Sequence, residues 1–239
     1  MNQFFNQAGT ATRAIDRATF DAGLRQHMLR VYNFMGLGLA LTGAVAFATA
    51  NIPALYNLIF GSPLMWLVML APLGFIFYFS YNFHRASASK LQTLFWVFCG
   101  LMGLSMASIF VVFTGADIAR AFFITAAMFG GTSLYGYTTK RDLTGMGAFM
   151  AMGLIGLIIA SLVNIFLASS ALQWAVSVAG VVIFTGLAAY DTQRIKEQYS
   201  EGHGVEANTK LAVMGALSLY LDFINLFQML LSLLGGRRE

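Results

Sequence analysis

Seven long apolar stretches restrict this chain of 239 residues to a bundle of membrane-spanning helices. They lie at residues 31–50, 58–82, 91–114, 118–138, 145–169, 172–190 and 209–234. A helix of about 20 residues crosses the hydrocarbon core of a bilayer, and every stretch is close to that length or longer. The sequence therefore predicts an all-α, polytopic membrane protein with seven transmembrane helices. Residues 1–28 would form a cytosolic N-terminal tail, and residues 29–236 a single transmembrane domain.

The composition supports a lipid environment and excludes several other classes of protein. Hydrophobic residues make up 58% of the chain and charged residues 10%, whereas soluble domains carry roughly 45–50% and 25%. The net charge of +4 comes from basic residues scattered through the connections, without a basic patch, so we expect no nucleic acid partner. A single cysteine, Cys99, excludes a disulfide framework or a cysteine-based metal site within one chain.

Lys and Arg are distributed unevenly between alternate connections. They recur in the N-terminal segment and in every second connection after it, whereas Arg120 stands alone on the other side before the C-terminus. Because cytoplasmic loops carry an excess of positive charge, this pattern predicts a cytoplasmic N-terminus. Seven spans would then leave the C-terminus outside, yet the chain ends in Arg237 and Arg238. The alternative that residues 209–234 re-enter the membrane instead of crossing it stays open.

The last apolar stretch carries an acidic residue near its middle. Asp222 has more than ten residues of the stretch on either side, so its short side chain cannot reach the interface. A charge at that depth costs about 2.5–3.5 kcal/mol on the most lenient scale. Steps of three and four residues place four small or polar residues on one helix face, namely Gly215, Ser218, Asp222 and Asn225. This polar stripe is either a functional ion or proton site or a structural network that fixes packing.

Two charged residues at the predicted cytoplasmic ends of other spans are candidates for the same site. Asp191 ends the sixth span, where it either pairs locally with Arg194 or faces Asp222 from a neighbouring helix. Two carboxylates in a medium of low dielectric cannot both ionise cheaply, so such a pair would share a proton near neutral pH and act as a pH sensor. Arg85 closes the second span and is either an interface anchor or a counter-ion to the acidic pair.

Three motifs follow one another along the chain: SLYGYTTKRDL from Ser133, YDTQ at the end of the sixth span, and ALSLYLDFINLF near the C-terminus. Together they resemble the Bax inhibitor-1 family, also called transmembrane Bax inhibitor motif or lifeguard proteins, and most closely its bacterial inner-membrane members. The resemblance covers essentially all seven spans. It implies six helices around a central seventh and a pH-sensitive calcium leak. It also assigns the family's aspartate pair to Asp191 and Asp222, and their basic partner to Arg85.

Residues and resemblance together predict a cation leak, with calcium as the expected ion and no tightly bound cofactor. Ionised Asp191 and Asp222 would bind Ca²⁺ transiently, with Ser218 and Asn225 on the supporting polar face, and protonation would remove these ligands. Arg85 would latch the closed state. The alternative is a non-conducting regulatory protein that binds a membrane partner, such as a quality-control protease or a stress-response factor. We expect no enzyme, because no span interior offers a histidine as the base for a buried serine.

Overall fold

The computed structural model describes the backbone of residues 2–235 and the side chains of residues 20–235. Within that range every regular element is a helix. The elements are α1 (Asn2–Asn51), α2 (Pro53–Phe60), α3 (Leu64–Asn82), α4 (Ala88–Met106), α5 (Ile109–Val112), α6 (Gly115–Thr138), α7 (Thr144–Leu167), α8 (Ser170–Gln198), the 3₁₀ turn η1 (Glu201–His203) and α9 (Gly204–Leu234). The predicted all-α class is confirmed for the described residues. Each of the seven apolar stretches is mainly helical, although turns at residues 61–63 and 107–108 interrupt the second and the third.

Six segments are long and apolar enough to cross a bilayer: Phe20–Asn51, Leu64–Asn82, Ala88–Val112, Thr144–Leu167, Ser170–Gln198 and Glu201–Leu234. Their outer faces expose large apolar side chains such as Phe166, which is 89% exposed. Such surfaces require lipid, and the chain is an integral membrane protein. The 24 residues of α6 do not meet the same criterion, because Asp117, Arg120 and several glycine, threonine and tyrosine residues lower its hydropathy. The predicted count of seven spans is therefore not confirmed.

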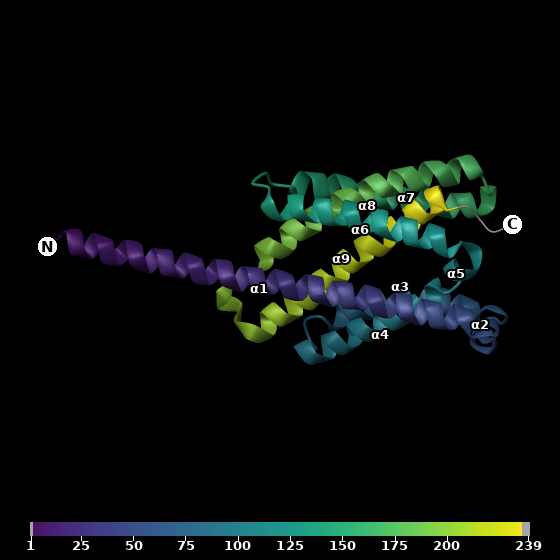
Figure 1. Ribbon diagram of the computed structural model, residues 1–239, viewed down its shortest axis with the longest axis horizontal. Helices are drawn as coiled ribbons and strands as arrows, with labels where there is room; N and C mark the ends of the chain where they lie inside the picture. Colours follow the sequence, from purple (N-terminus) through teal and green to yellow (C-terminus); the bar gives the residue numbers. More distant parts are fainter. Residues whose placement is uncertain (1, 236–239) are drawn as a thin grey trace.

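The C-terminal helix α9 occupies the centre of the bundle. Buried residues make up 56% of its apolar window, against 6–33% for the other five spans. It packs against α1, α4, α6 and α8, whereas α3 packs on α4 and α7 packs on α8. Figure 1 shows α9 crossing the bundle obliquely between α1 and α6. Polar side chains on α9 therefore face protein or internal cavities rather than lipid.

A buried hydrogen-bond network joins α9 to α1 and α4. The Thr42 hydroxyl donates to the backbone carbonyl of Cys99 at 2.9 Å, and it lies 2.7 Å from the Tyr220 hydroxyl. Because the single Thr42 hydroxyl hydrogen is already used, Tyr220 is the donor in the second bond. Gly103 lets α4 approach α1 closely, since a Cβ there would lie 2.7 Å from the Thr42 carbonyl oxygen. These contacts fix the register of three helices.

Two of the sequence motifs meet where the connection between α6 and α7 crosses α8. The Gln193 side chain accepts a hydrogen bond from the N–H of Leu143 and donates one to the carbonyl of Arg141, both at 2.8 Å. Lys196 donates to the carbonyl of Tyr137 at 2.8 Å. Side chains of α8 thus satisfy one carbonyl at the end of α6 and two backbone groups of the connection that follows it. Gln193 of the YDTQ motif therefore anchors the end of the SLYGYTTKRDL segment.

The structure also bears on the two ends of the chain, the predicted N-terminal tail and the last apolar stretch. The residues predicted as an N-terminal tail continue into the first span as one helix, α1, which extends beyond the rest of the bundle (Figure 1). The last apolar stretch forms an unbroken helix from Gly204 to Leu234, so the re-entrant alternative is not the conformation seen. No proline occurs within α9 to break its hydrogen bonds. Arg237 and Arg238 lie outside the described residues.

Candidate functional site

A cavity of about 590 Å³ opens between α3, α7, α8 and α9. Apolar side chains of α3 and α7, such as Leu73 and Leu157, form one side of it. The other side carries polar residues of α8 and α9, which are Asp191, Ser218, Asp222 and Asn225. We call this the acidic cavity. It brings together four of the five site residues that the sequence predicted.

Asp222 is the most deeply placed acid of this cavity. Its residue is 6% exposed, and its Oδ2 atom has no hydrogen-bond partner among the described residues. Asn225 lies one turn further along α9 and donates its amide hydrogen to the carbonyl of Leu221 at 2.8 Å. The predicted stripe thus faces one cavity at three of its four positions. Gly215 instead contacts α8, where a Cβ would lie 3.0 Å from the Ile195 side chain.

Asp191 faces the same cavity from α8, about two turns before that helix ends. Its Oδ1 atom lies 3.7 Å from an Arg194 guanidinium nitrogen one turn further along. The two alternatives drawn from the sequence therefore coexist in the structure. Asp191 makes the local ion pair with Arg194, and it also shares a cavity with Asp222.

The structure places Arg194, and not Arg85, beside Asp191. Arg85 lies in the turn that follows α3, where it is exposed, donates to the Tyr81 hydroxyl and stacks over the Tyr81 ring at 4.6 Å. Arg194 has a buried Nε atom without a hydrogen-bond partner among the described residues. The sequence predicted Arg194 only as a local partner of Asp191. The position of this Asp191–Arg194 pair next to α9 depends on the packing of α8 against α9, which no local spacing reveals.

The oxygen atoms of this cavity suit a passing cation better than a resident one. Within residues 20–235 no three His, Cys, Asp or Glu side chains gather closely enough to hold a metal ion. Ca²⁺ takes six to eight oxygen ligands, so two carboxylates must be completed by hydroxyl, amide, backbone carbonyl or water oxygens. Ser218 and Asn225 offer a hydroxyl and an amide on the same wall. Such a site would be weak and quickly exchanging.

Comparison with known proteins gives the family. Residues 24–239 match the family described as "Inhibitor of apoptosis-promoting Bax1". The chain belongs to this family. The three short motifs predicted a member of the Bax inhibitor-1 family, and that prediction is therefore confirmed.

Bacterial relatives of this family member align over nearly their whole length. The chain is 51% identical over 230 residues to an uncharacterized protein of Rickettsia prowazekii, covering 96% of this chain and 98% of the relative. It is 46% identical over 220 residues to the inner membrane protein YbhL of Escherichia coli, covering 91% and 94%. It is 42% identical over 214 residues to an uncharacterized protein of Borreliella burgdorferi, covering 89% and 92%. Relatives of similar length thus occur in distantly related bacteria.

Proposed function

We propose that this family member is a pH-sensitive cation leak pathway with Ca²⁺ as its cargo, in which Asp191 and Asp222 bind the cation and take up protons. One observation carries the proposal: the buried Asp222 carboxyl has an oxygen without a hydrogen-bond partner among the described residues, and it faces a cavity that holds a second carboxyl. An acid that served only packing would have its oxygens hydrogen-bonded, because an unpaired buried polar atom costs about 1–3 kcal/mol. Intramembrane acids retained at such a cost commonly belong to ion or proton pathways.

Arg194 acts in this proposal as the latch that the sequence analysis assigned to Arg85. When both carboxyls are ionised, the guanidinium beside Asp191 balances one of the two negative charges. Protonation of the pair then has two opposing effects. It removes charge that attracts Ca²⁺, and it also frees Arg194 from its partner. A leak that rises on acidification would mean that release of Arg194 dominates, and a leak that falls would mean that loss of ligands dominates.

The proposal includes α6 as the seventh span. Its 24 residues extend about 36 Å at 1.5 Å per residue, enough to cross the hydrocarbon core. Figure 1 shows α6 running between the two ends of the bundle, from the end of α5 to the start of α7. Its polar side chains are satisfied internally, as when the hydroxyls of Thr125 and Thr132 donate to the carbonyls of Ala121 and Met128.

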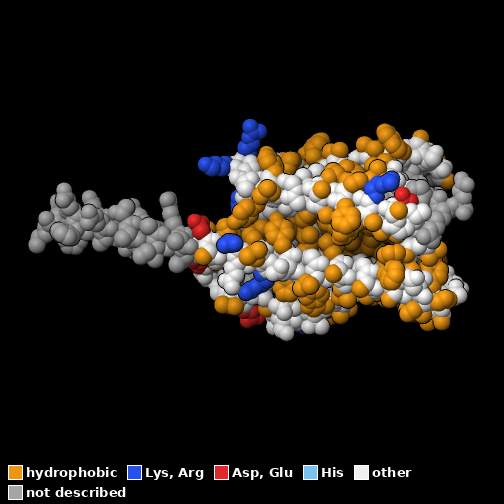
Figure 2. Space-filling view, in the orientation of Figure 1, with side chains coloured by type: hydrophobic (Ala, Val, Ile, Leu, Met, Phe, Trp, Pro, Cys, Tyr) orange, Lys and Arg blue, Asp and Glu red, His pale blue; other side chains and the backbone are white. Residues whose placement is uncertain are grey.

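The bacterial inner membrane is the proposed location, with the N-terminus in the cytoplasm. On the face shown in Figure 2, most Lys and Arg side chains gather at the end of the bundle nearest the start of the chain. That asymmetry supports a cytoplasmic placement of this end. The name of the Escherichia coli relative, an inner membrane protein, supports the choice of membrane.

The test is Ca²⁺ entry into dye-loaded proteoliposomes at pH 6, 7 and 8. We expect a pH-dependent leak from the unchanged protein and a leak without pH response from Asp222→Asn and Asp191→Asn. Asp21→Asn is the matched control, because Asp21 is an exposed acid of α1 outside the acidic cavity. No flux above empty liposomes at any pH, or an unchanged pH profile in Asp222→Asn, would reject the proposal.

A second function rests on the N-terminal extension of α1. Residues 2–19 belong to this helix, and Figure 1 shows the start of α1 projecting past the other helices. A projecting helix of this kind would suit a non-conducting regulatory protein that binds a membrane partner such as a quality-control protease or stress-response factor. Cross-linking in native membranes separates the two functions. If deletion of residues 2–19 removes a cross-linked partner while Ca²⁺ flux is absent from both forms, the regulatory function is favoured.

A further inference from the structure

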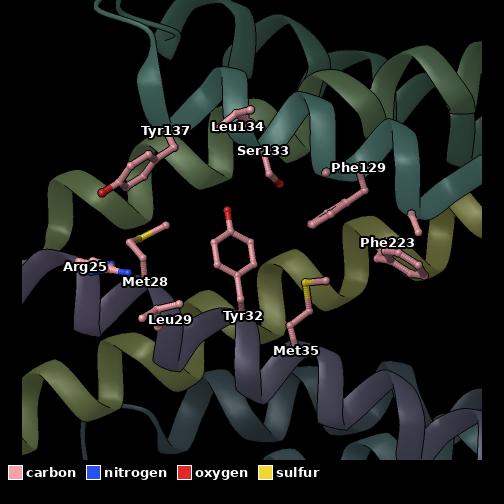
Figure 3. Close-up of a pocket in the computed structure, with 12 residues that line it drawn as sticks. Arg25, Met28, Leu29, Tyr32, Met35, Phe129, Ser133, Leu134, Tyr137 and Phe223 are labelled. Carbon is pink, nitrogen blue, oxygen red and sulfur yellow. The ribbon is translucent and has the colours of Figure 1, made fainter.

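A second cavity, of about 650 Å³, lies between α1 and α6 on a different face of α9. Figure 3 shows side chains of both helices converging on it, with Tyr32 pointing across from α1 toward α6. We call it the α1–α6 groove. Residues of both helices that bear on its function are Arg25, Leu29, Tyr32, Gly130, Leu134 and Tyr137. This groove plays no part in the proposed leak, and its function is independent of the leak.

The body of the groove is apolar and open to lipid. Leu29 on one rim is 52% exposed and Leu134 on the other is 63% exposed, while Phe223 of α9 is buried in its floor. Gly130 leaves free space along the α6 rim, since a Cβ there would meet no atom within 4 Å. The groove extends along α1 from residue 25 to residue 35, which at 1.5 Å per residue is about 15 Å. That is half of the roughly 30 Å hydrocarbon core, the depth of one leaflet.

Positive charge lies at one end of the groove only. Arg25 and Tyr137 stand together at that end (Figure 3). Lys196 approaches the same place, because its Nζ atom donates to the Tyr137 carbonyl and lies 5.7 Å from the Tyr137 ring centroid. Neither cation takes part in an ion pair with the side chains of residues 20–235. No acidic residue lines the groove.

We propose that the α1–α6 groove binds one anionic phospholipid. The phosphate lies against Arg25, with Lys196 behind it, and an acyl chain follows the groove past Leu29 and Leu134 toward Phe223. Charge complementarity selects an anionic headgroup, since two cations without acidic partners attract negative charge at the membrane surface. The apolar length of one leaflet selects a lipid chain rather than a soluble anion. A lipid bound here covers the gap that α1 and α6 leave over α9.

The experiment uses the full-length chain in detergent, with phosphatidylglycerol or phosphatidylcholine added and bound lipid counted by native mass spectrometry. Gly130→Phe fills the groove. Gly131→Phe is its matched control, because Gly131 is also exposed with free space around it but does not line the groove. Arg25→Gln removes the cation at the headgroup end. Lys90→Gln removes an exposed cation that lies outside the groove.

We expect phosphatidylglycerol to bind the unchanged protein and Gly131→Phe alike, and to be lost from Gly130→Phe. Arg25→Gln should bind it about fivefold more weakly, the effect of about 1 kcal/mol per basic residue. Lys90→Gln should bind it as the unchanged protein does. Equal binding of the two lipids, or Arg25→Gln binding as well as the unchanged protein, would overturn the proposal. A protein dimer that Gly130→Phe dissociates would also overturn it, because a second copy of the chain would then occupy the groove.

Discussion

Two of the cavities that border the central helix α9, the acidic cavity and the α1–α6 groove, place charge at opposite depths. Asp222 lines the acidic cavity, whereas the next residue, Phe223, lines the α1–α6 groove. Successive side chains on a helix are about 100° apart, so one helix can serve two separate sites. In the first cavity the charge lies deep within the bundle. In the second it lies at one end of an apolar groove. Within a membrane, the depth of a charge thus distinguishes a candidate ion site from a candidate headgroup site.

The largest expected effect comes from removing the deep charge. Asp222→Leu should abolish the pH response of Ca²⁺ flux completely. It should also raise the thermal stability of the protein, because it removes an unpaired buried oxygen that costs about 1–3 kcal/mol. Flux assays and thermal unfolding in the same detergent measure the two effects. A loss of stability would instead favour the structural interpretation, in which Asp222 fixes the packing of α9.

Reversing the charge of the α1–α6 groove should have the next largest effect. Arg25→Glu replaces attraction by repulsion, so phosphatidylglycerol should bind about thirtyfold more weakly, equivalent to about 2 kcal/mol. The pH response of the flux should be unchanged, because Arg25 does not line the acidic cavity. Native mass spectrometry measures the first quantity and proteoliposomes the second. An altered pH profile would show that the two cavities are coupled through α9.

Tyr220 lies on a third face of α9, and its substitution should change stability without altering the acidic cavity or the α1–α6 groove. Tyr220→Phe removes the hydroxyl that bonds Thr42, and the free energy of unfolding should fall by about 1 kcal/mol. Tyr220 lines neither the acidic cavity nor the α1–α6 groove, so both flux and lipid binding should persist. Thermal unfolding, flux and lipid counting on one preparation check the three expectations. Loss of either activity would mean that helix register, rather than local chemistry, controls that cavity.

The smallest expected effect comes from substitution of Arg194, the proposed latch. Arg194→Gln removes a positive charge that favours ionised carboxyls, so the midpoint of the pH response should move to higher pH. The shift should be below about one pH unit, because the Arg194 side chain is partly exposed and such ion pairs contribute little. Arg85→Gln is the control and should leave the midpoint in place. A shift in Arg85→Gln alone would restore the assignment made from the resemblance.

Much of this architecture is readable from local features of the chain. Hydropathy located seven helical stretches, and helical spacing placed Ser218, Asp222 and Asn225 on one face. Both are local properties that repeat within one or two turns, so neighbouring residues alone determine them. Three short motifs sufficed for the family. Hydropathy alone does not settle α6, because Asp117 and Arg120 near its start lower the mean, and hydropathy takes no account of hydroxyls that hydrogen-bond within the helix, as those of Thr125 and Thr132 do.

Only the tertiary structure decided which charges meet. Asp191, which pairs with Arg194, shares a cavity with Asp222 because α8 packs along α9, whereas Arg85 stays in the turn after α3. The α1–α6 groove likewise joins residues about 100 positions apart along the chain. The sequence determined the helices and their polar faces, since these depend on steps of three and four residues. The choice of neighbour for each face depends on side-chain packing between distant segments, which no local period records.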